Sequence, residues 1–154
     1  MKRPPHLEGI AALEKAGADF VLVGALGIGH YESALENTLA TFDCDVVFKP
    51  SAHALERALD ALTQRGAALE LEDGPLSVKT RLPGGMALDL MLEAPPFPYA
   101  LWRKRSNVFT AAGVRLNVGS LDMLLEAKRR ADRPKDRAFL AQWKALHPAK
   151  KKCA

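Results

Sequence analysis

The sequence predicts an α/β (α+β) fold in which helices flank a mixed sheet of about five strands and a pair of helices ends the chain. Short apolar runs that end at glycine, typical of buried strands, alternate with segments whose apolar residues recur every three to four positions. The 154 residues, 48% apolar and 26% charged, match the size and composition of a globular domain. We expect one domain over residues 1–147 and a basic tail over residues 148–154.

The first third of the chain predicts two helices and two strands. Leu7 to Ala16 has one apolar face and precedes Gly17, which indicates a helix with a glycine stop. The apolar run 20–23 ends at Gly24 and predicts a buried strand, followed by a short helix over 25–34. Residues 35–41 fit no element, and 43–49 predict the second strand.

The middle of the chain predicts a helix and then extended segments. Ser51 is suited to cap the helix that ends near Gly66, since a serine hydroxyl accepts from the first turn's free N–H groups. Extended runs follow at 68–71, 76–82 and 86–92, separated by glycine and proline turns.

The last third predicts a helix, a hairpin and two closing helices. The helix spans 99–106, after a proline-rich break, and the hairpin pairs 108–111 with 114–118. One closing helix runs from Ser120 to about Ala131. The other starts at Pro134, because proline suits the first helical position.

Composition excludes several classes of protein. Two cysteines without a C-x-x-C motif argue against a disulfide scaffold or a cysteine zinc site and fit a reducing cytoplasm. No apolar run approaches the roughly 20 residues that span a bilayer, and the first residues lack a signal peptide's apolar stretch. We therefore expect a cytoplasmic protein with no membrane contact.

Charge is distributed unevenly along the chain. Residues 128–154 contain ten Lys and Arg against two Asp and Glu, whereas residues 1–127 contain twelve against sixteen. An acidic body therefore carries a basic C-terminal end. Such an end is either a solvated tail or a surface for anionic partners such as RNA.

Asp43 and Asp45 stand two positions apart in a predicted strand, so their carboxylates would share one face. Like charges at this spacing repel, and a hard divalent cation such as Mg²⁺ offsets the repulsion. Asp89 interrupts an apolar run, where a lone carboxylate is costly unless it is paired or bound to a metal. If the two strands are neighbours, three carboxylates converge on one site. The alternative is that they face solvent at strand ends.

These features resemble the minimal nucleotidyltransferase fold of the polymerase-beta-like superfamily. The matching segments are 20–25, with its strand and glycine, 41–47, with its Asp-x-Asp strand, and the later Asp89. The segments 120–128 and 132–136 are similar to the Leu-x-x-x-Lys and Arg-Pro-Lys-Asp ending of small bacterial members related to abortive-infection and toxin nucleotidyltransferases.

The resemblance implies that a nucleoside monophosphate is transferred from an NTP to an acceptor hydroxyl, with Mg²⁺ or Mn²⁺ as cofactor. It implies metal binding by Asp43, Asp45 and Asp89, of which Asp89 would also accept the hydroxyl's proton. The acceptor would be RNA, such as a tRNA held by the basic C-terminal helices, or a small molecule. Other branches of the fold modify cationic aminoglycosides, for which an acidic cleft would be expected.

The nucleotide would be bound by Gly24, by Ala25 and by Lys128. Backbone N–H groups at the start of a helix favour phosphate. Position 25 is alanine where the family usually has glycine or serine, so a hydroxyl contact is missing. Lys128 falls on an apolar helix face, where it either pairs with Asp136 of the next helix or reaches the triphosphate.

The alternative function is a catalytically inactive nucleotidyltransferase-fold binding or antitoxin-like module, and a third is RNA binding without chemistry. The altered turn at Ala25 favours the inactive module, whereas the complete set of three aspartates favours the enzyme. A homo-oligomer or an antitoxin partner fits the small size of the chain, which leaves no room for a second substrate domain.

Overall fold

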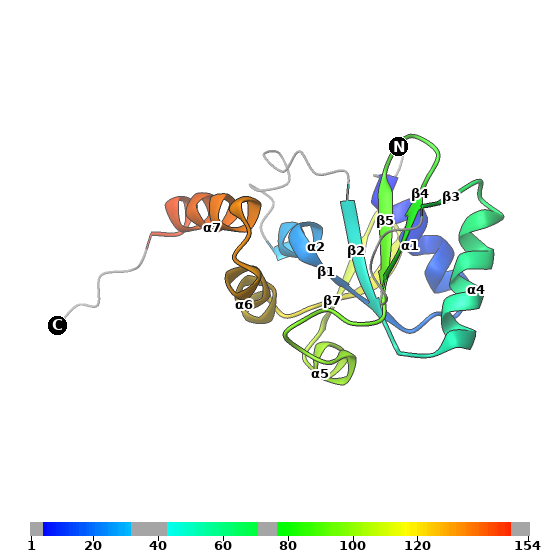
Figure 1. The fold of residues 1–154 in the computed structure, drawn as a ribbon, viewed down its shortest axis with the longest axis horizontal. Helices are drawn as coiled ribbons and strands as arrows, with labels where there is room; N and C mark the ends of the chain where they lie inside the picture. The colour runs from blue at the N-terminus through cyan, green and yellow to red at the C-terminus, as the bar shows by residue number, and fades with distance from the viewer. Residues whose placement is uncertain (1–4, 32–42, 71–76, 149–154) are drawn as a thin grey trace.

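The computed structural model describes residues 5–31, 43–70 and 77–148 (Figure 1). Within them, seven strands form one mixed sheet with helices packed around it. The strands are β1 Phe20–Val23, β2 Asp43–Phe48, β3 Ala68–Glu70, β4 Ser77–Arg81, β5 Ala87–Met91, β6 Asn107–Ala111 and β7 Val114–Val118. The helices are α1 Pro5–Lys15, α2 Gly24–Tyr31, α4 Ala52–Thr63, α5 Tyr99–Lys104, α6 Leu121–Ala131 and α7 Pro134–Leu146.

The strands are ordered β3-β4-β5-β2-β1-β7-β6 across the sheet. β2 and β5 pair in parallel, as do β1 and β7, and the other neighbours are antiparallel. The predicted mixed sheet is thus confirmed, but it has seven strands where about five were expected. Each of the seven strands lies at a run predicted as extended, so the expected total was too low although no individual strand was missed.

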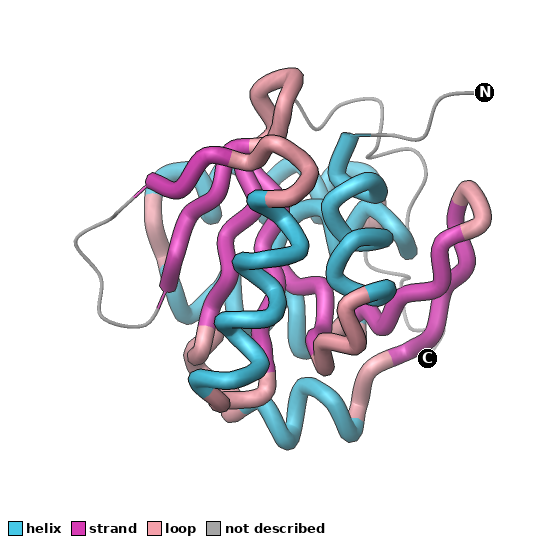
Figure 2. Tube along the Cα trace, turned by 90° about the vertical axis from the view of Figure 1, so that its right-hand side faces the viewer, coloured by secondary structure: helices cyan, strands magenta, loops and turns pink. Residues whose placement is uncertain are grey.

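The central strands form the middle of the hydrophobic core. All four residues of β1 are buried, and β2 and β5 contribute further buried apolar side chains. Helices α1 and α4 pack against each other on one side of the sheet, to the right of the strands in Figure 1. Figure 2, turned toward that side, shows helices in front of the strands.

Most predicted helices are present with small changes at their ends. The hydroxyl of Ser51 accepts a hydrogen bond from Ala54 N at 3.3 Å, which confirms the predicted cap of α4. The helix expected over 99–106 is shorter, because Arg105 leaves helical geometry with φ −102° and ψ 12°. The unassigned residues 35–41 lie outside the described part of the chain.

Helices α2, α6 and α7 lie on the other side of the strands, to the left in Figure 1. α2 packs against β1, β2 and α6, and α6 in turn packs against α7. The fold therefore brings the C-terminal helix pair next to the point where β1 ends and α2 begins. In the described ranges, none of these helices has the length and apolar character needed to cross a membrane.

A cluster of aromatic side chains connects α1 to α2 and β6. The His6 ring lies 5.7 Å from the His30 ring, and His30 lies 5.8 Å from Phe109. Nε2 of His6 is buried and has no hydrogen-bond partner among the described residues. Burial, and then the nearby charge of His30, lower the pKa of His6 from 6.5 to about 4. The neutral ring is therefore the form that fits the fold.

Acidification is expected to destabilise the protein through His6. Its folded pKa of about 4 lies below the unfolded value of 6.5, so between these values the unfolded state binds the extra proton. Stability is lost as the pH falls through this window. Urea denaturation measures how far the unfolding free energy falls between pH 7 and pH 4. This fall should be smaller in His6→Phe than in the wild-type protein, by roughly 1–3 kcal/mol.

The matched control is His53→Phe, at an exposed position near the start of α4. It should keep the wild-type dependence of stability on pH. Equal slopes for His6→Phe and wild type would contradict the account of this cluster.

Candidate active site

The junction of β1 and α2 lies against the carboxylate of Asp45. Val23, the last residue of β1, pairs with Asp45 across the antiparallel ladder. Gly24 follows with φ +74°, and a Cβ built on it would lie 2.6 Å from Oδ2 of Asp45. No larger residue fits here without moving the carboxylate, because both the backbone angle and the space require glycine.

Asp45 and Asp89 are direct neighbours in the parallel pair of β2 and β5. Both are half-buried, and Oδ1 of Asp89 is buried. Cys44 is fully buried, as expected for a core residue; burial raises the pKa of its thiol, and the charges of Asp45 and Asp89 raise it further. Two predicted site carboxylates are thus brought side by side.

The third predicted carboxylate, Asp43, is the first residue of β2 and pairs with Ala87 of β5. Its side chain lies outside what the structure describes. On the other side of β5, Lys79 of β4 pairs with Asp89, which places a cation in register with the two aspartates. The sequence analysis did not include Lys79 in the site.

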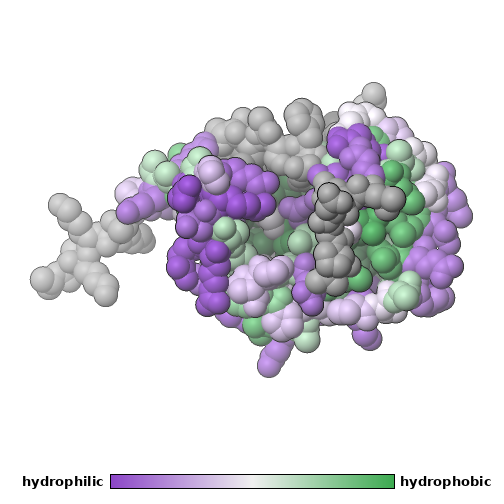
Figure 3. All heavy atoms as spheres, viewed as in Figure 1, coloured by the Kyte–Doolittle hydropathy of each residue, from purple (hydrophilic) through white to green (hydrophobic). Residues whose placement is uncertain are grey.

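One cavity of about 630 Å³ brings together predicted residues from both halves of the chain. Gly24, Ala25 and Asp45 line it from the strands and α2, and Lys128 lines it from α6. The other lining residues are an apolar group and two further cations: Val23, Met91, Ala94, Pro95, Trp102, Leu124, Ala127, Ala131, Phe139, Arg133 and Lys135. Figure 3 shows this face hollowed beside the hydrophilic residues of α6 and α7.

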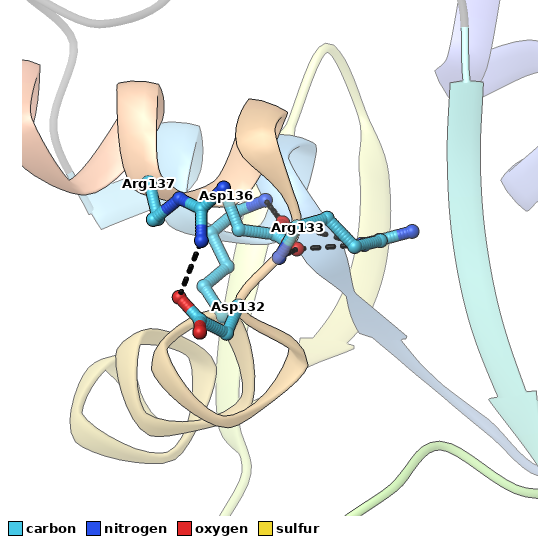
Figure 4. A network of polar contacts seen from close by, with 5 residues as sticks. Asp132, Arg133, Asp136 and Arg137 are labelled. Carbon is cyan, nitrogen blue, oxygen red and sulfur yellow. Dashed lines mark hydrogen bonds and ion pairs between the residues drawn. The ribbon is translucent and has the colours of Figure 1, made fainter.

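The cationic wall of the cavity is organised around Asp136, at the start of α7 (Figure 4). Its side chain has no exposed surface, and its Oδ1 lies 3.3 Å from Nζ of Lys128. Arg133 donates to Asp136 Oδ2 from Nε at 2.6 Å, and to Oδ1 from Nη2 at 3.2 Å. The predicted pairing of Lys128 with Asp136 is therefore confirmed.

Lys128 combines burial with access to the cavity. Its side chain is 13% exposed, and Nζ lies 4.7 Å from the centre of the Phe139 ring. Burial lowers the pKa of Lys128 below its ordinary value, although the charge of Asp136 opposes this shift and that of Asp45 also favours the charged form. Contact between Lys128 and a triphosphate stays a prediction.

The residues present suit a hard divalent cation. Mg²⁺ prefers carboxylate oxygen ligands and usually keeps several waters, so one or two carboxylates suffice together with substrate phosphates. Asp45 and Asp89 supply such oxygens from adjacent strands, and Asp45 lines the cavity beside Gly24. No group of three His, Cys, Asp or Glu suited to a metal occurs within the described side chains, which do not include that of Asp43.

The cavity contains residues that the sequence analysis did not place in the site. Arg133 and Lys135 were counted only as part of the basic end, and Trp102 and Phe139 only as parts of helices. Indole Nε1 of Trp102 donates to Ala94 O at 2.9 Å, which holds the loop after β5 against α5. The Arg-Pro-Lys-Asp motif was the available signal for the two cations.

The fold is similar to those of solved nucleotidyltransferase-type structures. A crystal structure of ANT(2'')-Ia in complex with adenylyl-2''-tobramycin superposes with a TM-score of 0.59 at 14% identity, over 87% of this chain and 82% of that one. A solution structure of the antibiotic-resistance factor ANT(2'')-Ia gives a TM-score of 0.55 at 14% identity, over 92% and 94%. JHP933 from Helicobacter pylori gives 0.52 at 16% identity, over 92% of this chain and 64% of that chain.

No protein-family model and no curated protein sequence matches the chain. The structural similarities confirm the nucleotidyltransferase fold. They do not distinguish the abortive-infection or toxin type, which stays a prediction.

Replacing Gly24 by alanine should destabilise the protein more than the strain of a positive φ alone would. Gly84 also has a positive φ, of +99°, but a Cβ there would meet no atom within 4 Å. Gly84→Ala should therefore lower the unfolding free energy by about 1 kcal/mol, through backbone strain alone. Gly24→Ala should lower it by roughly 1 kcal/mol more, because its Cβ also collides with Asp45. Urea denaturation of both variants measures the difference; equal losses would show that Asp45 does not constrain this junction.

Proposed function

We propose that the protein is a nucleotidyltransferase that moves a nucleoside monophosphate from an NTP to an acceptor hydroxyl. One observation supports this function above all: a single cavity joins the Asp45 carboxylate and the Gly24 junction to the ammonium group of Lys128. The Asp45 carboxylate, a candidate metal ligand, thus shares a space of small-molecule size with a cation suited to phosphate. Phosphoryl transfer depends mainly on such positioning and electrostatics.

In this proposal Asp43, Asp45 and Asp89 hold Mg²⁺ or Mn²⁺. A divalent ion bound there supplies positive charge that stabilises the transferring phosphoryl group. Asp45 and Asp89 support the assignment because they are register neighbours, and Asp43 stands two residues before Asp45 in the same strand.

The remaining roles in the proposed reaction belong to side chains and backbone groups of this protein. The acceptor oxygen attacks the α-phosphorus, its proton passes to the carboxylate of Asp89, and the bond to the pyrophosphate oxygen breaks. Backbone N–H groups of Gly24 and Ala25, at the start of α2, orient the phosphates. Lys128 stabilises the charge that develops on the leaving pyrophosphate.

The charge of the cavity favours an anionic acceptor over a cationic one. Lys128, Arg133 and Lys135 line it, whereas Asp45 is the one acidic residue among its described lining. ANT(2'')-Ia was solved with adenylylated tobramycin, and a cationic aminoglycoside would be repelled by these three cations. We propose RNA, such as a tRNA held by α6 and α7, as the acceptor, and a neutral or anionic small molecule as the alternative.

A catalytically inactive binding or antitoxin-like module is the second candidate. The alanine at position 25 favours it, because the resemblance implies a hydroxyl contact to the nucleotide phosphates that an alanine lacks. Assembly as a homo-oligomer or with an antitoxin partner, and a cytoplasmic location, belong to the same set of proposals. Binding of NTP without turnover is the result that identifies this module.

Transfer of label is the test of the proposed function. The protein is incubated with each α-³²P-labelled NTP, Mg²⁺ or Mn²⁺, and either total tRNA or tobramycin. We expect label on the RNA, no label on tobramycin, and loss of transfer on chelation with EDTA. Asp45→Asn should lower the rate by at least about a hundredfold, because it removes a charge that is needed for metal binding.

The matched control is Asp60→Asn, since Asp60 is an exposed aspartate on α4 outside the cavity. It should leave transfer unchanged. Absence of transfer to any acceptor would reject the enzyme, and metal-dependent NTP binding in that case would identify the inactive module. RNA binding that is weakened by salt but survives Asp45→Asn would instead identify an RNA-binding protein without chemistry.

A further inference from the structure

Asp136 is a fully buried carboxylate in a helix at the periphery of the fold. Among the described residues, Asp136 is the one charged residue that is buried. Burial raises its pKa, but hydrogen bonds from Arg133 and the charge of Lys128 outweigh this and keep the pKa below its usual value. The carboxylate is therefore ionised at neutral pH and needs both cations as partners.

Stability alone does not explain this arrangement. A buried ion pair is generally no more stabilising than apolar side chains of similar volume, because both charges lose their hydration. Here Phe139 and Leu124 already provide apolar surface beside the pair. The ion pairs with Asp136 do fix the positions of Lys128 and Arg133, and they thereby determine where positive charge lies in the cavity.

Both partners of Asp136 line the cavity that contains Asp45. Lys128 and Arg133 line this cavity together with Asp45, whose charge favours the charged form of both and raises their pKa values. Other cations of the same helices are paired elsewhere: Arg129 and Arg130 contact Glu126, and Arg137 contacts Asp132 at 3.6 Å (Figure 4). None of these three is among the cavity-lining residues.

The charge balance of the cluster leaves room for an anion. Asp136 carries one negative charge against two positive ones. It engages Nε and Nη2 of Arg133, while a guanidinium has five N–H donors in a planar fork suited to phosphate. The cluster thus keeps one net positive charge, and Arg133, which is 56% exposed and lines the cavity, keeps N–H donors that Asp136 does not use; Lys135 adds a further charge there.

We propose that Asp136 is a positioning residue that holds Lys128 and Arg133 as a two-cation cradle for the β- and γ-phosphates of the nucleotide. The proposal rests on the proposed function and extends it by giving Arg133 a binding role and Asp136 an indirect one. Asp136 acts through the two cations and does not itself touch the substrate.

Calorimetric titration with MgATP, adenosine and inorganic tripolyphosphate tests the cradle. In Asp136→Asn, affinity for MgATP and for tripolyphosphate should fall at least about tenfold, while affinity for adenosine is unchanged. Lys128→Met should cause a loss of similar size. The double variant should lose less than the product of the two single effects, because Asp136 acts partly through Lys128.

Asp132→Asn is the matched control, since Asp132 is an exposed aspartate four residues away that contacts only Arg137 among the ion pairs described. It should bind all three ligands as wild type does. If Asp136→Asn fails to fold, Asp136→Glu keeps the charge but displaces it, and the same selective loss of phosphate affinity is expected.

The outcomes separate this inference from the proposed function. Wild-type phosphate affinity in a folded Asp136 variant, or equal losses for adenosine and MgATP, would overturn the cradle even if label transfer occurs. Asp136-dependent tripolyphosphate binding without any label transfer would support the cradle and reject the enzyme. If wild type binds neither MgATP nor tripolyphosphate, both proposals are wrong.

Discussion

The close approach of the Gly24 backbone to the Asp45 carboxylate is the constraint on which the rest of the site depends. Since a Cβ at position 24 would lie 2.6 Å from Oδ2 of Asp45, a side chain there would displace this carboxylate. The helix that starts at this turn, α2, packs against α6, and α6 packs against α7. A local steric requirement thus links the strand carboxylates to residues far along the chain.

The two sides of the cavity have opposite charge and different supports. Asp45 lies on the acidic side, and the register of β2 and β5 places Asp89 beside it. The cations are fixed by a buried carboxylate at the start of α7, a helix that packs mainly against α6. A nucleotide that binds in the cavity would contact one side formed by paired strands and another side held in place by ion pairs. The cationic wall is therefore where binding is most easily altered.

Sequence alone predicted what depends on local pattern. Apolar runs indicated the central strands, and the register of Asp45 with Asp89 followed from the assumption that two such strands are neighbours. The edge strands β3 and β6 were predicted as the extended runs 68–71 and 108–111, but the expected sheet of about five strands did not include all seven runs. Trp102 was missed as a site residue because its place in the cavity depends on how α5 packs, whereas Arg133 and Lys135 lie in the Arg-Pro-Lys-Asp motif, which was the available signal for them.

The central claim is that carboxylates and cations act together on one metal-bound nucleotide. Binding of Mn²⁺, followed by electron paramagnetic resonance with and without ATP, tests this claim, because contact between the ion and the nucleotide phosphates couples their binding and this coupling is equal in both directions. The account predicts that ATP tightens Mn²⁺ binding to the wild-type protein, and that this gain disappears when Asp45 is replaced by asparagine. Equal Mn²⁺ affinity of the wild-type protein with and without ATP would contradict it.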